Sequence, residues 1–434
     1  MSEADTGGAR AGGLRLLVVV NHFDPDRGGG GAVYTDMCQG LAARGIEVTA
    51  WCPYPFYPEW TDKSGRNGWR LWRYVERGVN VVRYGFFLPS NPRSFAQRML
   101  FELSLALSLT RLVPAARRFD AIMVYCPYFG SVVAVGLMKM LFGKPVWLNV
   151  QDISSDAAAG TGMVRGGALK GLLAGVESFF FNRADVWSSL SPVMIERLEQ
   201  LRRRDQPILF LPNWVDDALS RALAANERPD RAPGTPPRLL YAGNIGGKQD
   251  LLAFLMTLHE SAADFRFAIF GNGGEAGKVR DWVAATGDPR FSFGPFLDAG
   301  RLAEELTAAD FYVITERSGT GASFFPSKYV TGIAAGTPIL AVCDAAGPLG
   351  REMESAATGP CLDWSAASQV PALLADIARA PERWHGWRRR AQRRAADFDR
   401  NAILDRLVVN LERFAAREHQ RTVRSLGEIA GSAR

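Results

Sequence analysis

The chain has 434 residues, 47% of them hydrophobic and 22% charged, so it is long enough for two or three domains with more than one buried core. This composition excludes disordered, collagen-like and low-complexity chains. The net charge of +6 permits an anionic partner, but we identify no nucleic-acid-binding motif and expect no nucleic-acid partner.

Cysteine spacing and the first residues indicate a cytoplasmic protein. The five cysteines form no C-x-x-C pair and suit neither a disulfide framework nor a zinc site. Residues 1–13 lack the apolar core of a signal peptide, and we expect a disordered leader. The longest uncharged run, residues 121–138, is interrupted by Pro127 and Gly130, which favours a strand followed by a helix over a membrane span.

Strands and helices alternate along the first half of the chain. The apolar run of residues 14–21 predicts a buried parallel strand, and a glycine-rich turn and a helix over residues 32–45 follow it. Such alternation predicts a doubly wound α/β sheet. Further strands are expected at residues 47–53, 79–85, 121–127, 145–152 and 185–191.

The second half repeats the pattern after an interruption. Residues 215–238 lose apolar periodicity and are rich in proline and charge, which is typical of a linker. A helix is expected at residues 250–261, and strands at 238–244, 265–274, 290–296, 310–316 and 338–344. The predicted divisions are a leader (1–13), a first Rossmann-like domain (14–212), a linker (213–237), a second Rossmann-like domain (238–390) and a C-terminal helix and tail (391–434).

Glycine-rich loops follow several of these strands, where doubly wound domains bind ligands. Residues 28–31 open the first helix, so their backbone N–H groups either contact a phosphate or sugar or only form a flexible turn. Lys248, in the loop 241–250, either contacts a diphosphate or is a solvated surface lysine. The third loop, residues 270–282, repeats the order of strand, glycines and helix. The fourth loop enters a helix near Pro326, which places Lys328 close to the positive helix start.

The order and spacing of five segments resemble the retaining GT-B glycosyltransferases of family 4. The similarity extends from residue 14 to about residue 414 and is greatest to the subgroup that adds sugars to bacterial polysaccharide precursors. The segments are NHFDPDRGGGGAVYTDMCQGLAARGIEVT, NVQDISSDAAAGTGM, LPNWVDD, YAGNIGGKQD and FFPSKYVTGIAAGTPIL.

The resemblance implies an α/β GT-B fold, in which two doubly wound Rossmann-like domains face each other across a cleft. The first domain would hold the acceptor, and the second would hold a UDP- or GDP-linked sugar. It also implies a retaining, metal-independent hexosyl- or acetamidohexosyltransferase without a cofactor. The acceptor would be a hydroxyl of a saccharide, linked to polyprenyl diphosphate, in bacterial cell-surface polysaccharide synthesis.

The chain departs from the family pattern at three positions. The two glutamates that the family often carries fall on Ser323 and Thr331, and the usual arginine after the first strand of the second domain is Asn244. The alternative is therefore a catalytically silent nucleotide-sugar-binding subunit of a polysaccharide synthesis complex. The absence of G-x-G-x-x-G argues against a nicotinamide-dependent oxidoreductase.

Asp152 and Lys328 are the candidate catalytic residues. Asp152 follows a strand and either acts on the acceptor hydroxyl or caps a helix. Lys328 and Lys248 would stabilise a departing diphosphate. Glu316 either bonds hydroxyls of the donor sugar or is a surface charge, and His22 is expected to be structural. The candidate donor-binding residues are Gly29, Gly30, Gly243, Asn244, Lys248, Gly271, Asn272, Glu316, Phe325, Pro326, Ser327 and Thr331.

Residues 91–119 are apolar around most of a helix, with arginines at both ends. They predict either a buried helix or an interfacial helix whose arginines contact anionic lipid headgroups. An aromatic and basic segment, residues 54–73, lies just upstream. A lipid-linked acceptor would explain both segments, so we expect a peripheral protein on the inner face of the cytoplasmic membrane.

Overall fold

The computed structural model describes residues 13–26, 30–92, 94–126, 128–152, 167–227, 231–320 and 325–431. The chain divides into two compact units. The first unit comprises residues 1–149, 178–187 and 404–434, and the second comprises residues 150–177 and 188–403. Residues 1–12, which contain most of the predicted leader, lie outside the described residues.

Eight strands form the first sheet within the described residues, in the order β3-β4-β2-β1-β5-β6-β7-β8. The strand β1 pairs in parallel with β2 and with β5, whereas β3 pairs antiparallel with β4. The strands are β1 (Arg15–Val19), β2 (Glu47–Pro53), β3 (Trp72–Glu76), β4 (Val79–Tyr84), β5 (Ala121–Cys126), β6 (Val146–Val150), β7 (Val186–Ser189) and β8 (Ile208–Phe210).

The central strands of the first sheet are buried on both faces. Four consecutive residues of β1, Leu16 to Val19, are completely buried, and all six residues of β5 are buried. Continuous apolar burial is what a parallel strand needs when helices cover both faces of its sheet. The helices of this half of the chain are α1 (Gly31–Ala42), α2 (Phe95–Thr110), α3 (Phe129–Phe142), α5 (Gly167–Phe181), α6 (Pro192–Leu201) and α7 (Asp217–Ala224).

Six strands form the second sheet within the described residues, in the order β11-β10-β9-β12-β13-β14. All of its pairings are parallel. The strands are β9 (Arg238–Asn244), β10 (Arg266–Asn272), β11 (Phe291–Gly294), β12 (Phe311–Thr315), β13 (Ile339–Val342) and β14 (Cys361–Leu362). The helices are α8 (Leu251–His259), α9 (Ala276–Thr286), α10 (Ala299–Ala308), α11 (Ser327–Ala334), α12 (Pro348–Ala356), α13 (Val370–Arg379), α14 (Glu382–Ala395) and α15 (Arg400–Gly431).

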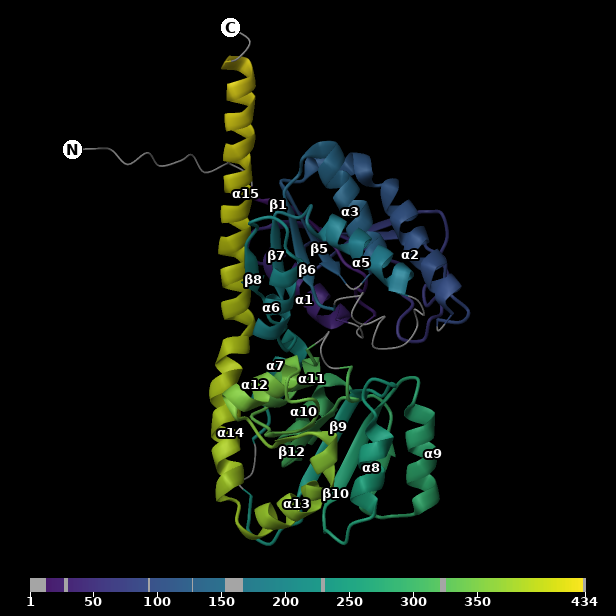
Figure 1. Cartoon of the computed structure of the whole chain (residues 1–434), viewed down its shortest axis with the longest axis vertical. Coiled ribbons are helices and arrows are strands. Elements are labelled where there is room, and N and C mark those ends of the chain that lie inside the picture. The colour runs from purple at the N-terminus through teal and green to yellow at the C-terminus, as the bar shows by residue number, and fades with distance from the viewer. Residues whose placement is uncertain are drawn as a thin grey trace, which may run out of the picture. The chain divides into compact units, whose positions relative to one another are not determined.

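The second sheet separates two apolar cores. Leu239 and Tyr241 of β9 pack into one core with residues of α8 and α9, which lie beside β9 and β10 in Figure 1. Leu240 and Ala242, which point the other way, pack into a core with residues of α10, α11 and α12. Alternate side chains of one strand therefore enter opposite layers, as expected for a doubly wound sheet.

The α/β class and the doubly wound sheets predicted from the sequence are confirmed, and each predicted strand has an observed counterpart. The strands β3, β8 and β14 have no predicted counterpart. Most of β3 is exposed, so it lacks an apolar pattern, and β8 and β14 have only three and two residues. The helix α7 lies within the segment predicted as a linker.

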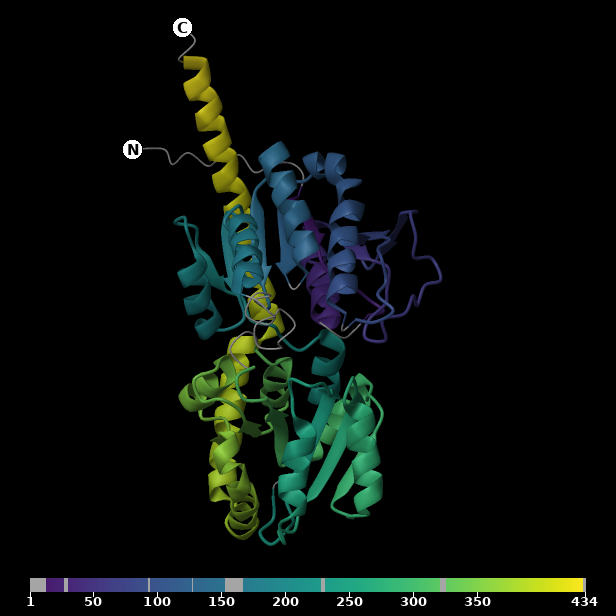
Figure 2. The ribbon, with the colours of Figure 1, turned by 45° about the vertical axis from the view of Figure 1, so that its right-hand side comes forward.

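The segment 91–119 forms two pieces rather than one helix. The helix α2 ends at Thr110, and the 3₁₀ helix Val113–Arg118 follows it. The helices α2 and α3 lie side by side in both views of the ribbon (Figures 1 and 2). In the part of the chain that the structure describes, no helix combines the length and apolarity required to cross a bilayer.

A buried carboxylate network holds α11, α12 and α14 together. The Arg394 guanidinium donates from Nε to Glu352 Oε1 (2.7 Å) and from Nη2 to Oε2 (2.9 Å). The Tyr329 hydroxyl also donates to Glu352 Oε1 (2.8 Å). Because Tyr329 directly follows Lys328, this network fixes the position of the helix turn that carries Lys328.

We predict that Arg394→Met lowers the free energy of unfolding by about 3 kcal/mol, because it leaves the buried Glu352 carboxylate without its cation. Thermal and urea unfolding of the whole chain measure the change. The neighbouring Arg393 is exposed, so Arg393→Met serves as the matched control and should change the free energy by less than about 0.5 kcal/mol. Equal effects of both substitutions would contradict a stabilising role for this network.

Candidate functional site

The candidate site lies at the carboxyl ends of the strands of the second sheet. In this sheet β10 and β11 lie on one side of β9, and β13 and β14 lie on the opposite side of β12. The loops that follow β9 and β12 therefore diverge. The register pairs Gly243 with Gly271 and Asn244 with Asn272 at the ends of β9 and β10. Two Gly-Asn pairs from separate loops therefore lie side by side next to the point of divergence.

Glycine is required at the ends of both strands. A Cβ atom on Gly271 would lie 1.9 Å from the Gly243 carbonyl oxygen. Gly243 has a φ of +123°, and a Cβ atom there would lie 3.3 Å from Lys328 Nζ. The two glycines therefore let the backbones of β9 and β10, and the Lys328 side chain, approach one another closely.

Lys328, in the first turn of α11, reaches back to the end of β9. Its Nζ donates to the Asn244 carbonyl oxygen (3.4 Å) and lies 4.8 Å from the centre of the Tyr241 ring. The Tyr241 hydroxyl donates to the same carbonyl oxygen (2.6 Å). Burial lowers the pKa of Lys328 to about 8, although the charge of Glu316 opposes this shift. This half-buried ammonium group is suited to binding an anion.

Glu316 directly follows β12 and is only 3% exposed, so its interpretation as a surface charge is wrong. Neither of its carboxylate oxygens has a hydrogen-bond partner among the described residues. Burial, with a smaller effect from Asp344, raises the pKa of Glu316 to about 8, whereas Lys328 and Lys248 favour the charged form. A buried carboxyl group without a partner is costly, so it marks a position where a ligand can supply the missing hydrogen bonds.

Hydrogen bonds hold the Glu316 backbone and the loop after it. The Glu316 N–H donates to the Val342 carbonyl (2.9 Å), and Trp364 Nε1 donates to the Glu316 carbonyl (2.7 Å). The Asp344 carboxylate accepts from Ser318 Oγ (2.8 Å) and from the Gly319 N–H (2.6 Å). The segments after β13 and β14 therefore position Glu316.

Lys248 and Asp152, both in the second unit, form an ion pair with 3.5 Å between Lys248 Nζ and Asp152 Oδ2. The Lys248 carbonyl also accepts from the Arg317 N–H (2.7 Å), which ties the loop after β9 to the loop after β12. The helix that Asp152 was alternatively expected to cap would begin outside the described residues. Within the described ranges, no group of three or more His, Cys, Asp or Glu is arranged to hold a metal ion.

The remaining predicted donor-binding residues of the second sheet lie along α11. Pro326 immediately precedes this helix, and Ser327 is exposed in its first turn. The Phe325 side chain instead packs in the core, 5.4 Å from the Tyr329 ring. Thr331 Oγ1 donates to the Ser327 carbonyl (3.2 Å). Gly29 and Ser323 lie outside the described residues.

Three residues at this site were missed in the sequence, namely Tyr241, Asp344 and Trp364. Asp344 ends a predicted strand, so its position after the strand was a usable signal. Tyr241 lies inside a predicted strand and carries no such signal. Trp364 is far from Glu316 in the sequence and reaches it only because β14 adds to the edge of the sheet.

Another polar cluster lies in the first sheet. It is found between β1 and β5, where the strand order of that sheet diverges. His22 follows β1 and is 3% exposed, and its Nε2 lies 3.1 Å from the hydroxyl of Tyr128, which follows β5. His22 Nδ1 has no partner among the described residues. Burial lowers the pKa of His22 to about 3, so its imidazole is neutral at physiological pH. The half-buried Tyr57 ring lies 4.8 Å from the His22 ring.

The helix α1 begins against this cluster. Gly30 caps it with a φ of +89°, and a Cβ atom on Gly31 would lie 3.1 Å from the Cβ atom of His22. The buried Asp26 accepts from the Phe56 N–H (2.8 Å) and so holds the segment after β2 nearby. The amino end of α1, the segment after β2 and His22 therefore meet at the carboxyl edge of the first sheet.

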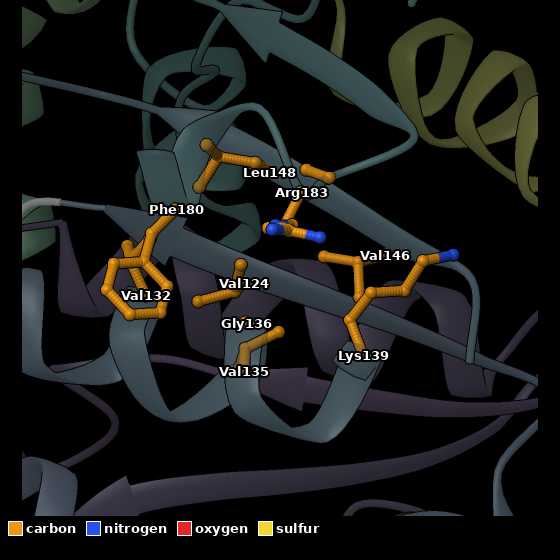
Figure 3. Close-up of a pocket in the computed structure, with 10 residues that line it drawn as sticks. Val124, Val132, Val135, Gly136, Lys139, Val146, Leu148, Phe180 and Arg183 are labelled. Atoms are coloured by element: carbon orange, nitrogen blue, oxygen red, sulfur yellow. The ribbon is translucent and has the colours of Figure 1, made fainter. Parts of the chain in front are cut away.

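A narrow pocket lies elsewhere in the first unit, between α3 and the sheet (Figure 3). Val132 and Gly136 of α3 and Val146 at the start of β6 help to line it. A Cβ atom on Gly136 would lie 2.5 Å from the Phe180 ring, so the helix and this ring are already in close contact. Lys139 and Arg183 also line the pocket, but most of its lining is apolar and it lies away from the carboxyl ends of the strands, so we attribute it to packing.

Comparisons with known proteins support the interpretation of this chain as a glycosyltransferase. Residues 28–214 match the family model of the glycosyl transferase 4-like domain. The chain is 27% identical over 383 residues to the putative colanic acid biosynthesis glycosyl transferase WcaI of Escherichia coli (strain K12). That alignment covers 85% of this chain and 92% of WcaI.

Solved structures give the fold. Sucrose-phosphate synthase from Thermosynechococcus elongatus matches with a TM-score of 0.68 and 16% identity, covering 93% of this chain and 99% of that one. HepE of Anabaena, solved in complex with UDP and glucose, matches with a TM-score of 0.65 and 13% identity, covering 92% and 99% of the two chains. The chain therefore has the GT-B fold that its sequence predicts, with two Rossmann-like domains.

We predict that Glu316→Gln stabilises the protein above about pH 6. The pKa of Glu316 is raised to about 8 in the folded protein, so between its ordinary value and pH 8 the folded state holds a proton that the unfolded state has released. The stability contributed by this group therefore falls as pH rises through that window. At pH 8 the glutamine variant should be more stable by at least about 1 kcal/mol in urea unfolding.

The exposed Glu354 provides the matched control, because Glu354→Gln should leave the pH dependence of stability unchanged. Lys328 remains charged in the folded and the unfolded state over most of the range from pH 5 to 8. Its own titration therefore does not account for the expected difference in stability between Glu316→Gln and wild-type protein. If Glu316→Gln and wild-type protein show the same pH dependence between pH 5 and 8, the carboxyl group is not held protonated by its surroundings.

Proposed function

We propose that the chain is a retaining glycosyltransferase that transfers a hexosyl or acetamidohexosyl group from a UDP- or GDP-linked sugar. The acceptor is a hydroxyl of a saccharide linked to polyprenyl diphosphate, in the synthesis of a bacterial cell-surface polysaccharide. The observation that carries this proposal is the grouping of Lys328, Glu316 and the two Gly-Asn pairs where the second sheet diverges. The similarity to WcaI supports the polysaccharide context, and the UDP complex of HepE supports the class of donor.

In the proposed donor complex, the diphosphate lies at the carboxyl ends of β9 and β12. Lys328 and Lys248 supply positive charge to it, and the first turn of α11, which has no side-chain cap hydrogen bond among the described residues, adds backbone N–H donors. Glu316 accepts hydrogen bonds from hydroxyls of the sugar or ribose, which gives its buried oxygens the partners that the described protein lacks. The two lysines stabilise the leaving diphosphate without a metal ion.

On the acceptor side, we assign to Asp152 of the second unit the role of orienting the acceptor hydroxyl and taking its proton. Separately, the cluster around His22 in the first unit is the proposed binding site for a saccharide. A neutral imidazole with a free ring nitrogen can exchange a hydrogen bond with a sugar hydroxyl, and the neighbouring half-buried Tyr57 provides an aromatic surface. The proposed saccharide site therefore belongs to the first unit, whereas the proposed base, Asp152, belongs to the second.

An anionic membrane is the proposed partner of the first unit, which would make the protein peripheral on the inner face of the cytoplasmic membrane. One face of α2 packs inward through Phe101 and Leu105, whereas Leu103 and Leu107 on the other face are more than half exposed. A contiguous exposed apolar stripe on a monomer marks an interaction surface. Arg117 and Arg118 are exposed just beyond the helix and suit anionic headgroups.

The alternative is a silent subunit that binds a nucleotide sugar without transferring it. Ser323 and Thr331, which stand where the family often carries glutamates, favour this alternative. One experiment separates the two functions: the purified chain is incubated with a panel of UDP- and GDP-linked hexoses and acetamidohexoses. Release of UDP or GDP supports the transferase, whereas binding detected by a thermal shift without any release supports the silent subunit.

We predict that Lys328→Ala and Lys248→Ala each lower turnover of the preferred donor at least tenfold. Each removes one cation from the diphosphate, and a single electrostatic contact in a preorganised site typically contributes a few kcal/mol to transition-state stabilisation. Released nucleoside diphosphate measures turnover. The exposed Lys278 of α9 pairs only locally, with Glu275 (2.7 Å), so Lys278→Ala is the matched control.

The proposed diphosphate site would be contradicted if Lys328→Ala and Lys248→Ala both changed turnover only slightly. It would also be contradicted if Lys278→Ala lowered turnover equally. The same assay with EDTA tests metal independence, because activity carried by lysines should survive the chelator. Loss of activity in EDTA that Mg²⁺ or Mn²⁺ restores would contradict that part of the proposal.

We predict that the double variant Leu103→Gln, Leu107→Gln binds phosphatidylglycerol vesicles at least about tenfold more weakly than wild type. Burying each leucine in the interface contributes roughly 1.5 kcal/mol or more. Co-sedimentation at low and high salt measures the binding. Arg117→Gln and Arg118→Gln should weaken it by ~1 kcal/mol each at low salt and little at 1 M salt.

Met256 of α8 is similarly exposed in the other unit, so Met256→Gln is the matched control and should not change vesicle binding. Because the substituted leucines are exposed, folding and nucleotide binding should be retained. Wild-type protein that does not sediment with anionic vesicles at low salt would contradict the membrane proposal.

A further inference from the structure

Two cysteines meet next to Glu316 in the second unit. Cys343 directly follows β13, and Cys361 is the first residue of β14, with 3.6 Å between their sulfur atoms. The Cys343 N–H donates to the Leu362 carbonyl (3.0 Å), which holds the end of β13 beside β14. Cys343 is completely buried and Cys361 is exposed. Cys361 is therefore the member of the pair that a solution reagent can approach, and its sulfur lies next to that of Cys343.

The two thiols differ in acidity. A hydrogen bond with Cys361 and burial raise the pKa of the Cys343 thiol. Hydrogen bonding from Cys343 lowers the pKa of Cys361, because a donated S–H stabilises a thiolate. An exposed cysteine with increased thiolate character is the form that reacts with oxidants. The other three cysteines, Cys38, Cys52 and Cys126, are completely buried.

Each of the two cysteines lies within three residues of a side chain that positions the candidate site. Cys343 precedes Asp344, whose carboxylate accepts from Ser318 Oγ and the Gly319 N–H. Cys361 lies three residues before Trp364, whose indole N–H donates to the Glu316 carbonyl. The loop that begins with Glu316 is therefore held from both sides by segments that carry these cysteines.

We propose that Cys361 and Cys343 form a peroxide-sensitive pair whose oxidation to a disulfide weakens the donor site. The Cys361 thiolate attacks one oxygen of hydrogen peroxide and releases hydroxide, which gives a sulfenic acid. The Cys343 thiol then attacks this sulfur, and the hydroxyl group leaves as water with the thiol proton. Overall, two thiols and one peroxide give one disulfide and two waters.

We expect closure of the disulfide to change the geometry beside Glu316. A disulfide requires about 2.05 Å between the sulfur atoms, so the sulfurs have to approach from 3.6 Å. This movement rotates the two cysteine side chains and, where rotation alone does not close the gap, displaces the end of β13 or the start of β14, and with it the hydrogen bond made by Asp344 or by Trp364. We expect weaker nucleotide binding as a result. Only this last step rests on the proposed function.

The first experiment follows the chemistry in the full chain. Reduced protein is treated with hydrogen peroxide, and peptide mass spectrometry should find Cys343 joined to Cys361 while Cys38, Cys52 and Cys126 remain thiols. In Cys343→Ser, dimedone should trap the sulfenic acid on Cys361. In Cys361→Ser, no disulfide should form. Failure to form the 343–361 disulfide, or preferential oxidation of another cysteine, would overturn the pair.

The second experiment measures the effect on the site by titrating UDP and GDP into reduced and oxidised protein. The nucleotide that binds should bind at least about fivefold more weakly after oxidation, which corresponds to the loss of roughly one hydrogen bond, and dithiothreitol should restore its affinity. Cys361→Ser should bind equally with and without peroxide. An unchanged affinity despite a formed disulfide would overturn the regulatory role. If reduced protein binds neither nucleotide, the donor site and its regulation both fail, whereas the peptide data still decide whether the disulfide forms.

Discussion

The parallel pairing of β9 with both β10 and β12 is the constraint on which the candidate site depends. It places the carboxyl ends of three strands at one edge and makes the sheet diverge beside β9. Asn244, Glu316 and Lys328 are far apart in the sequence, yet the edge brings their loops together. A Cβ atom on Gly271 could not fit against the Gly243 carbonyl, so the register itself requires these glycines. The chemistry of the site is therefore a consequence of strand order.

Two buried glutamates show how a structural carboxylate differs from a functional one. Glu352 receives a bidentate guanidinium and a tyrosine hydroxyl, so its charge is fully compensated within the fold. Glu316 is equally buried, but within the described part of the chain its oxygens have no such partners, and its pKa is raised to about 8. Proteins retain an uncompensated polar group of this kind mainly where a ligand compensates it. This contrast is the physical reason why we propose a donor site at Glu316 and not at Glu352.

Much of the fold could be predicted from the sequence because buried parallel strands are continuous apolar runs. The strands β1, β5 and β9 are examples. The edge strands β3 and β14 could not be predicted, since an exposed or two-residue strand leaves no apolar pattern. Within the site, glycines and lysines in loops after strands were visible. The burial of Glu316, the Tyr241 ring beneath Lys328 and the indole of Trp364 depend on long-range packing, which a local pattern does not encode.

Neither compact unit is a continuous piece of the chain. The polypeptide leaves the first unit near residue 150, returns to it for residues 178–187, and returns again with residues 404–434, whose described part, residues 404–431, belongs to the long helix α15. Gene fusion or recombination with one crossover between the sheets would therefore leave each product without segments that complete it. If the proposed donor site is correct, we expect exchange of donor specificity between related genes to proceed by changes within loops, such as those after β9 and β12, more readily than by exchange of whole domains.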